Sequence, residues 1–267
     1  MRVNGKQAEW LGDSVASVAG RCFPGADLAL VDGAPVEAGD WDAVSPGAES
    51  EVILARRNIL PDPDVYQSLL LSRNHPGTVA RLAAATVGVA GCGGLGSNAA
   101  LALARMGIGG LVLADFDIVE PTNLNRQAYF AEDIGKPKVD ALAGLLARVN
   151  PCVRVSCHNV RLDENTVPAI FAGCDVILEC LDAAEAKRMF VETVLSGIRD
   201  VPLVAASGLA GLGDANLITT RRAMGRLWMV GDGESGVMPG TGLAAPRVLV
   251  AAGHQALCAA RLIVGAE

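Results

Sequence analysis

Short apolar runs alternate with longer amphipathic segments from residue 86 onward. Runs of three to five mostly apolar residues predict buried strands, and the segments between them have the length and spacing of helices. We expect strands at 87–90, 111–114, 153–155, 175–178 and 201–205, and helices near 97–106, 136–149, 164–172 and 183–196. Strands that alternate with helices favour an α/β fold, with a mostly parallel sheet and helices on both of its faces.

The first 54 residues have a different pattern. Apolar runs at 28–31 and 51–54 are separated by the turn signals Asp32-Gly33 and Pro46-Gly47, which predicts a small strand-rich module. A polar connector follows, with helical pieces on either side of the break at 74–77. We therefore divide the chain into three parts: 1–57, a connector at 58–85, and 86–267.

Two further segments need an interpretation. Residues 97–114 are apolar enough to suggest a membrane span, but Arg105 and a glycine break divide them, which indicates a buried helix followed by a buried strand. Residues 221–245 are rich in glycine and are expected to form a functional or mobile loop. Ala245-Pro246 then opens a terminal helix that runs to about Val264.

Composition narrows the class of protein. The 267 residues include 22 basic and 29 acidic side chains, giving a net charge of −7, and no basic run, so nucleic acid is not expected as a partner. The seven cysteines are scattered and form no C-x-x-C pair, which argues against a disulfide framework and a structural zinc site. With no apolar leader after Met1, we expect a cytoplasmic protein that binds no membrane.

The strongest local signal is the run G-C-G-G-L-G-S-N at 91–98, placed after an apolar strand and at the start of a helix. Glycines allow the backbone to approach a phosphate, and the helix N-terminus offers free N–H groups. No Lys-Ser/Thr follows, so this is not a Walker A loop. A dinucleotide-binding fold of the dehydrogenase type is the alternative at this point.

A second polar run, 115–127, follows the next strand. An acidic residue such as Asp115 at that position can accept hydrogen bonds from ribose hydroxyls in a Rossmann-like unit. Hydride transfer does not require the cations that come next, Arg126 and Lys138, whereas a triphosphate does, because its charge must be neutralised when a phosphoryl centre is attacked. The alternative for either cation is a solvated surface charge.

Four motifs together resemble the ThiF/MoeB/HesA superfamily, the bacterial relatives of ubiquitin-activating enzymes. They are G-C-G-G-L-G-S-N, D-F-D-I-V-E-P-T-N-L-N-R-Q, G-K-P-K and L-E-C-L-D, within residues 86–220. The resemblance implies an adenylyltransferase that binds ATP and Mg²⁺. Its substrate would be a small β-grasp sulfur carrier, whose C-terminal glycine carboxylate becomes an acyl-adenylate as pyrophosphate is released.

The resemblance also implies site residues. Asp115 would hold the ribose, and Asn123, Arg126 and Lys138 would hold the phosphates. Asp182 would bind the magnesium ion, although it could instead be the N-cap of the helix that follows. Asp117 and the glycines of the first motif, Gly91, Gly93, Gly94 and Gly96, complete the expected nucleotide site.

The sequence departs from the superfamily's motifs in two ways that change the expected metal and chemistry. Many relatives carry two C-x-x-C zinc pairs and a reactive cysteine in a crossover loop, whereas residues 181–257 contain no cysteine. The stretches S-G-L-A-G-L-G-D-A-N, W-M-V-G-D-G-E-S-G and L-A-A-P-R-V-L-V-A-A-G-H-Q-A resemble the zinc-free second ThiF subtype. We therefore expect no zinc, and adenylation without sulfur transfer.

The first 54 residues resemble a ThiS-type β-grasp carrier, through M-R-V-N-G-K, V-D-G-A-P-V-E and the run 40–54. A working carrier ends in Gly-Gly, whereas this chain continues through Arg56-Arg57 and offers no carboxylate there. The superfamily's homodimers supply an arginine to the partner's site. Arg73 is the first candidate for that role here, and Arg56 and Arg57 are weaker ones.

The leading hypothesis is adenylation of a ThiS-like carrier in thiamine thiazole synthesis. The same chemistry on another carrier, a peptide or a modified tRNA nucleoside is a second hypothesis, and a non-catalytic nucleotide-binding scaffold is a third. His254 on the terminal helix could face the pocket, but a structural role is the preferred interpretation. Glu179 is expected on the side of its strand opposite Asp182 if the strand extends that far.

Overall fold

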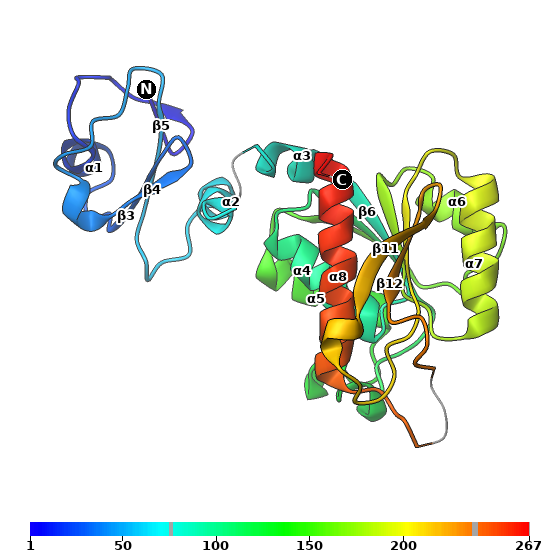
Figure 1. Cartoon of the computed structure of the whole chain (residues 1–267). Helices are drawn as coiled ribbons and strands as arrows, with labels where there is room; N and C mark the ends of the chain where they lie inside the picture. The colour runs from blue at the N-terminus through cyan, green and yellow to red at the C-terminus, as the bar shows by residue number, and fades with distance from the viewer. Residues whose placement is uncertain (75–76, 237–239, 267) are drawn as a thin grey trace. The chain divides into compact units, whose positions relative to one another are not determined.

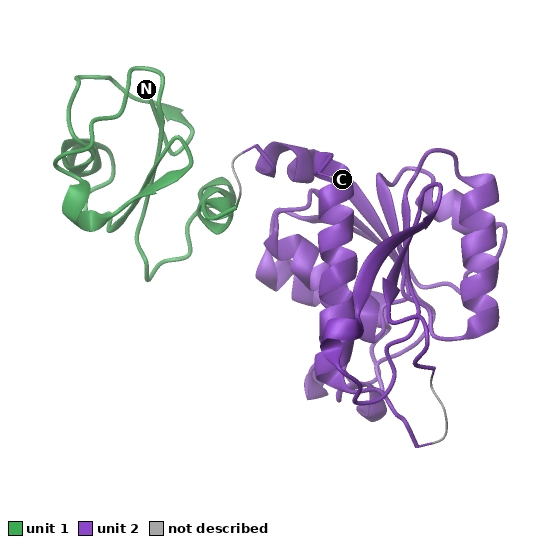
Figure 2. Cartoon of the chain, viewed as in Figure 1, with its two compact units in different colours: residues 1–76 green, residues 77–267 purple. Residues whose placement is uncertain are grey.

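The computed structural model describes residues 1–74, 77–236 and 240–266. The chain forms two compact units, Met1–Pro76 and Gly77–Glu267 (Figures 1 and 2). The boundary lies about twenty residues beyond the one expected at 57, and it divides the connector between the units. His75 and Pro76, at the break expected between the connector helices, lie outside the described residues.

The first unit is a five-stranded sheet with the order β2-β1-β5-β3-β4. Its elements are β1 (Arg2–Val3), β2 (Lys6–Gln7), α1 (Val15–Cys22), β3 (Leu28–Val31), β4 (Ala34–Val36), β5 (Glu51–Ala55) and α2 (Pro63–Leu71), with a 3₁₀ turn at Ala38–Asp40. The first and last strands, β1 and β5, pair in parallel, and the other pairs are antiparallel. The small strand-rich module expected from the sequence is thus observed, while its likeness to a ThiS-type β-grasp carrier stays a prediction.

Both faces of this small sheet are covered. Val15, Val18 and Ala19 of α1 pack against one face. Val65 and Leu69 of α2 pack against the other face, over Leu30 and Ile53. Because α2 buries apolar side chains of the sheet, the first part of the connector belongs to the first unit.

The second unit is a seven-stranded sheet with the order β11-β12-β10-β9-β6-β7-β8. Its strands are β6 (Thr86–Ala90), β7 (Gly110–Ala114), β8 (Arg154–His158), β9 (Val176–Glu179), β10 (Leu203–Ala206), β11 (Thr219–Met224) and β12 (Leu227–Gly231). All neighbours pair in parallel except β11 with β12. The mostly parallel sheet is thus confirmed.

Helices cover both faces of this sheet (Figure 1). They are α3 (Val79–Ala84), α4 (Gly94–Arg105), α5 (Lys138–Val149), α6 (Thr166–Phe171), α7 (Ala184–Gly197) and α8 (Ala245–Val264), with 3₁₀ turns at Pro121–Asn123, Ala131–Asp133 and Ala215–Leu217. One core joins α3, α4, α5 and α8 to the sheet, and a second joins α6 and α7 to its other face. In the second core Phe190 of α7 meets Phe171 edge to face, with ring centroids 5.7 Å apart.

The segment expected as a loop at 221–245 contains regular structure. Its first residues complete β11, and Leu227–Gly231 forms β12, which pairs with β10. Gly225 turns the hairpin with φ +49°, and a Cβ on Gly231 would lie 1.7 Å from the Ser207 carbonyl oxygen. The expectation of one long loop was wrong, because Gly225 forms the tight turn of the hairpin and Gly231 allows its strand to lie close to the Ser207 backbone. Residues 237–239 lie outside the described residues.

The terminal helix α8 is the longest in the described chain. By length and composition it is apolar enough to cross a membrane, but half of its apolar window is buried within the fold. Val248, Ala252, Ala256 and Ala259 belong to the core that it shares with α4. Residues 97–114, which also suggested a membrane span, form α4 and the buried β7 as expected.

Candidate functional site

A cavity of about 1050 Å³ opens at the carboxyl ends of the parallel strands in the second unit. Strand β6 has β7 on one side and β9 on the other, so the order of the sheet reverses between β6 and β9. Open α/β sheets bind their ligands in the crevice at such a reversal. The residues that follow β6, β7, β8, β9 and β10 all contribute to the cavity wall.

The glycine run shapes the floor of this cavity. Gly91 has φ +92°, and a Cβ there would lie 2.7 Å from the Cys180 carbonyl oxygen. A Cβ on Gly96 would lie 1.9 Å from the Gly91 carbonyl oxygen, so Gly96 lets α4 pack against the loop. Gly93 is the N-cap of α4 and has no side-chain cap. The first-turn N–H groups of α4 are therefore offered toward the cavity that Gly93 and Gly94 line.

Asp115 lies at the end of β7 with both carboxylate oxygens engaged. One accepts the Cys92 N–H at 2.6 Å and the other accepts the Asp117 N–H at 2.8 Å. Burial raises the pKa of this carboxyl, and the two N–H donors oppose that rise. The carboxylate is thereby held rigidly at the cavity wall, and its remaining lone pairs can accept hydrogen bonds from hydroxyl groups.

Lys138 enters the cavity from the first turn of α5. Its Nζ lies 2.8 Å from Asp117 Oδ2, and its N–H donates to the Asp117 carbonyl oxygen. The lysine side chain is buried, while that of Asp117 is 45% exposed. Asp117 therefore fixes the direction of the lysine.

Arg126 and Asn123 have different positions. Arg126 lines the cavity, and its guanidinium donates to the Thr122 carbonyl oxygen and to Asn125 Oδ1. Asn123 is buried and does not line the cavity. Its Oδ1 accepts the Glu120 N–H, which closes a capping box around the 3₁₀ turn. Asn123 thus shapes the loop that carries Arg126, and a phosphate contact stays a prediction.

Asp182 follows β9 on the opposite wall. Its side chain is exposed and lines the cavity, and among the described residues it has neither an ion pair nor a hydrogen bond. The N-cap of α7 is Ala183, without a side-chain cap, so Asp182 is not consumed by helix capping. No group of three or more His, Cys, Asp and Glu side chains that could hold a metal occurs in the described chain.

A buried ion pair supports this wall of the cavity. It was not predicted from the sequence. Glu179 is 1% exposed, and Lys187 Nζ donates to both of its oxygens at 3.0 and 2.9 Å. The same Nζ donates to the Ala206 carbonyl oxygen, and Glu179 also accepts the Leu181 N–H. Burial raises the pKa of Glu179, and Lys187 opposes that rise. The pair joins the ends of β9 and β10 beside Asp182.

Glu179 and Asp182 line the same cavity, and the opposite orientation was expected only if the strand extended as far as Asp182. Strand β9 ends at Glu179, and the two-residue alternation does not continue through the turn. The sequence does contain a signal for this ion pair. Lys187 follows Asp182 by five residues, which places a cation one turn into the helix that follows the strand.

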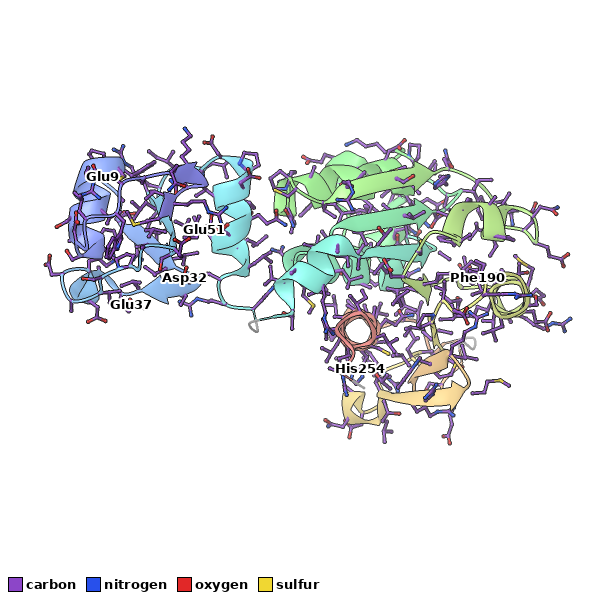
Figure 3. The ribbon with its side chains drawn as sticks, turned by 90° about the horizontal axis from the view of Figure 1, so that it is seen from above. Glu9, Asp32, Glu37, Glu51, Phe190 and His254 are labelled. Atoms are coloured by element: carbon purple, nitrogen blue, oxygen red, sulfur yellow. The ribbon has the colours of Figure 1, made fainter. Side chains whose placement is uncertain are left out.

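Two further candidates, Arg73 and His254, are not among the residues that line this cavity. Arg73 is exposed in the first unit, just after α2. His254 Nδ1 lies 2.9 Å from Thr220 Oγ1, where α8 covers the β11–β12 hairpin (Figure 3). His254 is therefore structural, as preferred from the sequence.

Comparisons with known proteins agree with this geometry. Molybdopterin-synthase adenylyltransferase of Salmonella typhimurium is 32% identical over 187 residues, covering 67% of this chain and 73% of that protein. Adenylyltransferase and sulfurtransferase UBA4 of Yarrowia lipolytica is 38% identical over 130 residues, covering 48% of this chain. The chain spans 32% of the length of UBA4.

A solved structure shares the fold. The E. coli tRNA N6-threonylcarbamoyladenosine dehydratase, crystallised with ATP, superposes with a TM-score of 0.68 at 22% identity. The match covers 78% of this chain and 98% of that one. The profile of the ThiF family matches residues 66–267, which include the whole cavity wall. The chain belongs to the ThiF family.

Proposed function

We propose that this protein is an ATP-dependent adenylyltransferase that converts the C-terminal carboxylate of a sulfur carrier into an acyl-adenylate. One observation carries the proposal. A single cavity combines a glycine loop at a helix N-terminus, a rigid carboxylate, two cations and an unpaired carboxylate, which are Asp115, Arg126, Lys138 and Asp182. These are the groups that binding and attack of a nucleoside triphosphate require.

The chain's own residues divide the work. Asp115 accepts hydrogen bonds from the ribose hydroxyls, and the N–H groups at the start of α4 donate hydrogen bonds to the phosphates. Arg126 and Lys138 neutralise the charge that develops on the α-phosphoryl group and on the pyrophosphate. Lys138 can do so without reorganisation because Asp117 already fixes its ammonium group.

The residues fit a magnesium ion. Mg²⁺ in nucleotide sites is held by one or two carboxylates together with substrate phosphates, so a single free carboxylate is sufficient. Asp182 is such a carboxylate, exposed on the wall opposite Lys138. When bound, the ion supplies charge neutralisation at the phosphates. No zinc is part of the proposal.

In the reaction, a carboxylate oxygen of the substrate attacks the α-phosphorus, and the bond to the bridging oxygen of pyrophosphate breaks. Small-molecule and cofactor pockets commonly have volumes of about 300–1,000 Å³, so a cavity of about 1050 Å³ is at the upper end of the range for a bound ligand. Its wall continues past Ala206 to Gly208 and Ala210.

We propose a ThiS-like carrier, and hence a role in thiamine thiazole synthesis. The similarity to an adenylyltransferase over two thirds of both chains supports a carrier substrate. The β-grasp topology of the first unit supports a chain that acts with proteins of that fold. Dehydration of a tRNA nucleoside would use the same activation chemistry, but the likeness to the E. coli dehydratase concerns the fold alone.

The proposal extends to a cytoplasmic homodimer that supplies Arg73 to the partner's site. The free cysteines support a reducing compartment. Arg73 is the preferred arginine because its side chain is exposed, whereas Arg56 and Arg57 donate hydrogen bonds within their own unit.

Exchange of labelled pyrophosphate into ATP tests the function. The full chain is incubated with ATP, Mg²⁺ and a ThiS-like carrier that ends in Gly-Gly, and a parallel sample contains the carrier without its last glycine. Exchange with the intact carrier alone supports the proposal. Equal exchange with both, or with neither while ATP binds, contradicts carrier adenylation.

A further inference from the structure

A buried tyrosine connects two segments of the cavity without lining it. Tyr129 is 4% exposed and lies in the core that α4, α5 and α8 share with the sheet. Its hydroxyl oxygen lies 2.8 Å from the Cys92 carbonyl oxygen and 3.2 Å from the Lys138 carbonyl oxygen. Cys92 belongs to the glycine loop, and Lys138 is the first residue of α5. The single phenolic proton is therefore shared between two segments whose residues line the cavity.

Cys92 is held from both sides by this arrangement. Its N–H donates to Asp115 Oδ2, and its carbonyl oxygen accepts from the Tyr129 hydroxyl. Cys92 is fully buried, and Tyr129 is the only donor to this carbonyl oxygen among the described residues. A buried carbonyl group without a donor is unfavourable, so the Tyr129 hydroxyl determines the direction in which this carbonyl points.

The direction of the Cys92 carbonyl also sets the direction of an N–H group. The Cys92–Gly93 peptide is trans, so its carbonyl oxygen and its N–H point in opposite directions. Because the carbonyl points into the core at Tyr129, the Gly93 N–H points away from the core, toward the cavity that Gly93 lines. No residue in the described part of the chain accepts a hydrogen bond from this N–H. It is therefore available to a ligand.

The second acceptor of the Tyr129 hydroxyl fixes the start of α5. The Lys138 N–H donates to the Asp117 carbonyl oxygen, its Nζ donates to Asp117 Oδ2, and its carbonyl oxygen accepts from Tyr129. Burial raises the pKa of the Tyr129 hydroxyl, so this group remains a donor at neutral pH. The residue that carries the buried ammonium group is thus tied to the glycine loop.

We propose that Tyr129 is a positioning residue for the triphosphate, which orients the Gly93 N–H and holds it in register with the Lys138 side chain. This inference rests on the proposed function, because it assumes that the cavity binds ATP. Tyr129 does not line the cavity, so it acts through these two groups and not on the nucleotide itself. Its loss therefore affects the binding of phosphates and spares the binding of a nucleoside.

Titration calorimetry with ATP and with adenosine separates these two effects. Each is titrated into the full-length protein and into its Tyr129→Phe and Asn150→Ala variants. Tyr129→Phe removes the hydroxyl and retains the ring. Asn150→Ala is the matched control, because Asn150 is buried at the other end of α5, donates to the Ala104 carbonyl oxygen and does not line the cavity. Both variants lose buried hydrogen bonds, so both should lower the thermal unfolding midpoint.

We expect Tyr129→Phe to weaken ATP binding about tenfold, as the loss of one oriented hydrogen bond does, and to leave adenosine binding unchanged. Asn150→Ala should leave both affinities unchanged, although its unfolding midpoint falls. Unchanged ATP affinity in Tyr129→Phe would overturn the inference. So would an equal loss of affinity for ATP and adenosine, which would mean that the hydroxyl only stabilises the fold.

Nuclear magnetic resonance of the wild-type protein provides a second measurement, which does not depend on the folding of Tyr129→Phe. ATP should shift the amide resonance of Gly93, because its N–H donates to a phosphate, and adenosine should leave that resonance in place. A Gly93 resonance that saturating ATP does not move would show that this N–H is not directed at the phosphates, and the inference would fail.

Failure of the proposed function has a different result in the same titrations. If the wild-type protein binds neither ATP nor adenosine, the nucleotide site itself is wrong, and the role of Tyr129 is lost with it. If the wild type binds both and only Tyr129→Phe departs from the expected pattern, the adenylyltransferase proposal stands without this positioning residue.

Discussion

Charged residues at the ends of strands have different roles in the two units. In the first unit, Arg56 donates to the Pro24 carbonyl oxygen and lies 5.9 Å from the Phe23 ring centroid. Arg57 donates through its backbone to Asp27 Oδ1 and through its side chain to the Asp27 carbonyl oxygen. Both arginines after β5 therefore complete the fold of their own unit.

In the second unit, the fold leaves charged groups free on the cavity wall. Asp182 and Arg161 have no ion pair among the described residues, and Arg126 donates only within its own loop. An unpaired charge at such a position does not stabilise the fold, but it is available to bind a charged ligand. We therefore place the functional site at the strand ends of the second unit, where these charged groups are unpaired.

The largest expected effect is at Asp182. We expect Asp182→Ala to lower Mg²⁺-dependent pyrophosphate exchange roughly 100-fold or more, because a preorganised charge contact in the transition state is lost. The thermal unfolding midpoint should not change, since the side chain is exposed. The control is Glu185→Gln, an exposed carboxylate on the same wall. Turnover like wild type in Asp182→Ala would remove the metal assignment.

The buried pair beneath Asp182 should affect stability. Lys187→Met leaves the Glu179 carboxylate buried without its cation, which should lower the free energy of unfolding by about 3 kcal/mol. The double variant Lys187→Met/Glu179→Gln should recover part of that loss, because no charge is then buried alone. Urea unfolding measures both. If the single variant is as stable as the double one, the pair does not hold the wall together.

The Asp232–Arg247 ion pair beside the cavity makes stability depend on pH. Burial acts to raise the pKa of Asp232, but hydrogen bonds from Ser235, Glu234 and Arg247 outweigh it and hold that pKa well below its usual range. A lowered pKa gives stability that is present above about pH 4 and is lost as the pH falls toward the folded-state value.

We therefore expect Asp232→Asn to lower the free energy of unfolding at pH 7 by about 2 kcal/mol, because Arg247 is left buried without its partner. Urea unfolding of both proteins at pH 7 and pH 3 should show a smaller difference at pH 3. A difference that is constant over this range would mean that the ionised carboxylate does not stabilise the fold.

The smallest effect is expected in the first unit. Arg56→Gln should lower the free energy of unfolding by less than about 1 kcal/mol and leave pyrophosphate exchange unchanged. Thermal unfolding measures the expected loss of stability, and the exchange assay measures the activity. A tenfold fall in exchange would show that the end of β5 takes part in the reaction, and the contrast between the two units would then fail.

The central strands could be predicted because they are buried on both faces and form continuous apolar runs, so the expected strands at 87–90 and 111–114 each fall one residue short of the observed ones. The prediction missed β11, an edge strand whose Thr219-Thr220-Arg221-Arg222 run has no apolar alternation. It also missed β12, because the glycines around it dominated the composition. A Leu-Trp-Met-Val run was the available signal.

Residues of the site were predictable where a motif holds them close together in the sequence. The glycine loop, Asp115, Arg126, Lys138 and Asp182 line one cavity, as the motifs implied. The Tyr129 hydroxyl joins the glycine loop to the start of α5, and contacts of this kind depend on how separate segments pack in the fold. The capping role of Asn123 was readable, because Glu120 stands three residues before it and Pro121 opens the turn.

Mass spectrometry of the carrier shows directly whether this protein adenylates a carrier carboxylate. The full chain is incubated with ATP, Mg²⁺ and a ThiS-like carrier, and the intact mass of the carrier is measured at once. We expect a carrier that ends in Gly-Gly to gain one AMP, and the carrier without its last glycine to gain none. AMP on neither carrier, in a sample where ATP is bound, would show that this protein does not adenylate such a carrier.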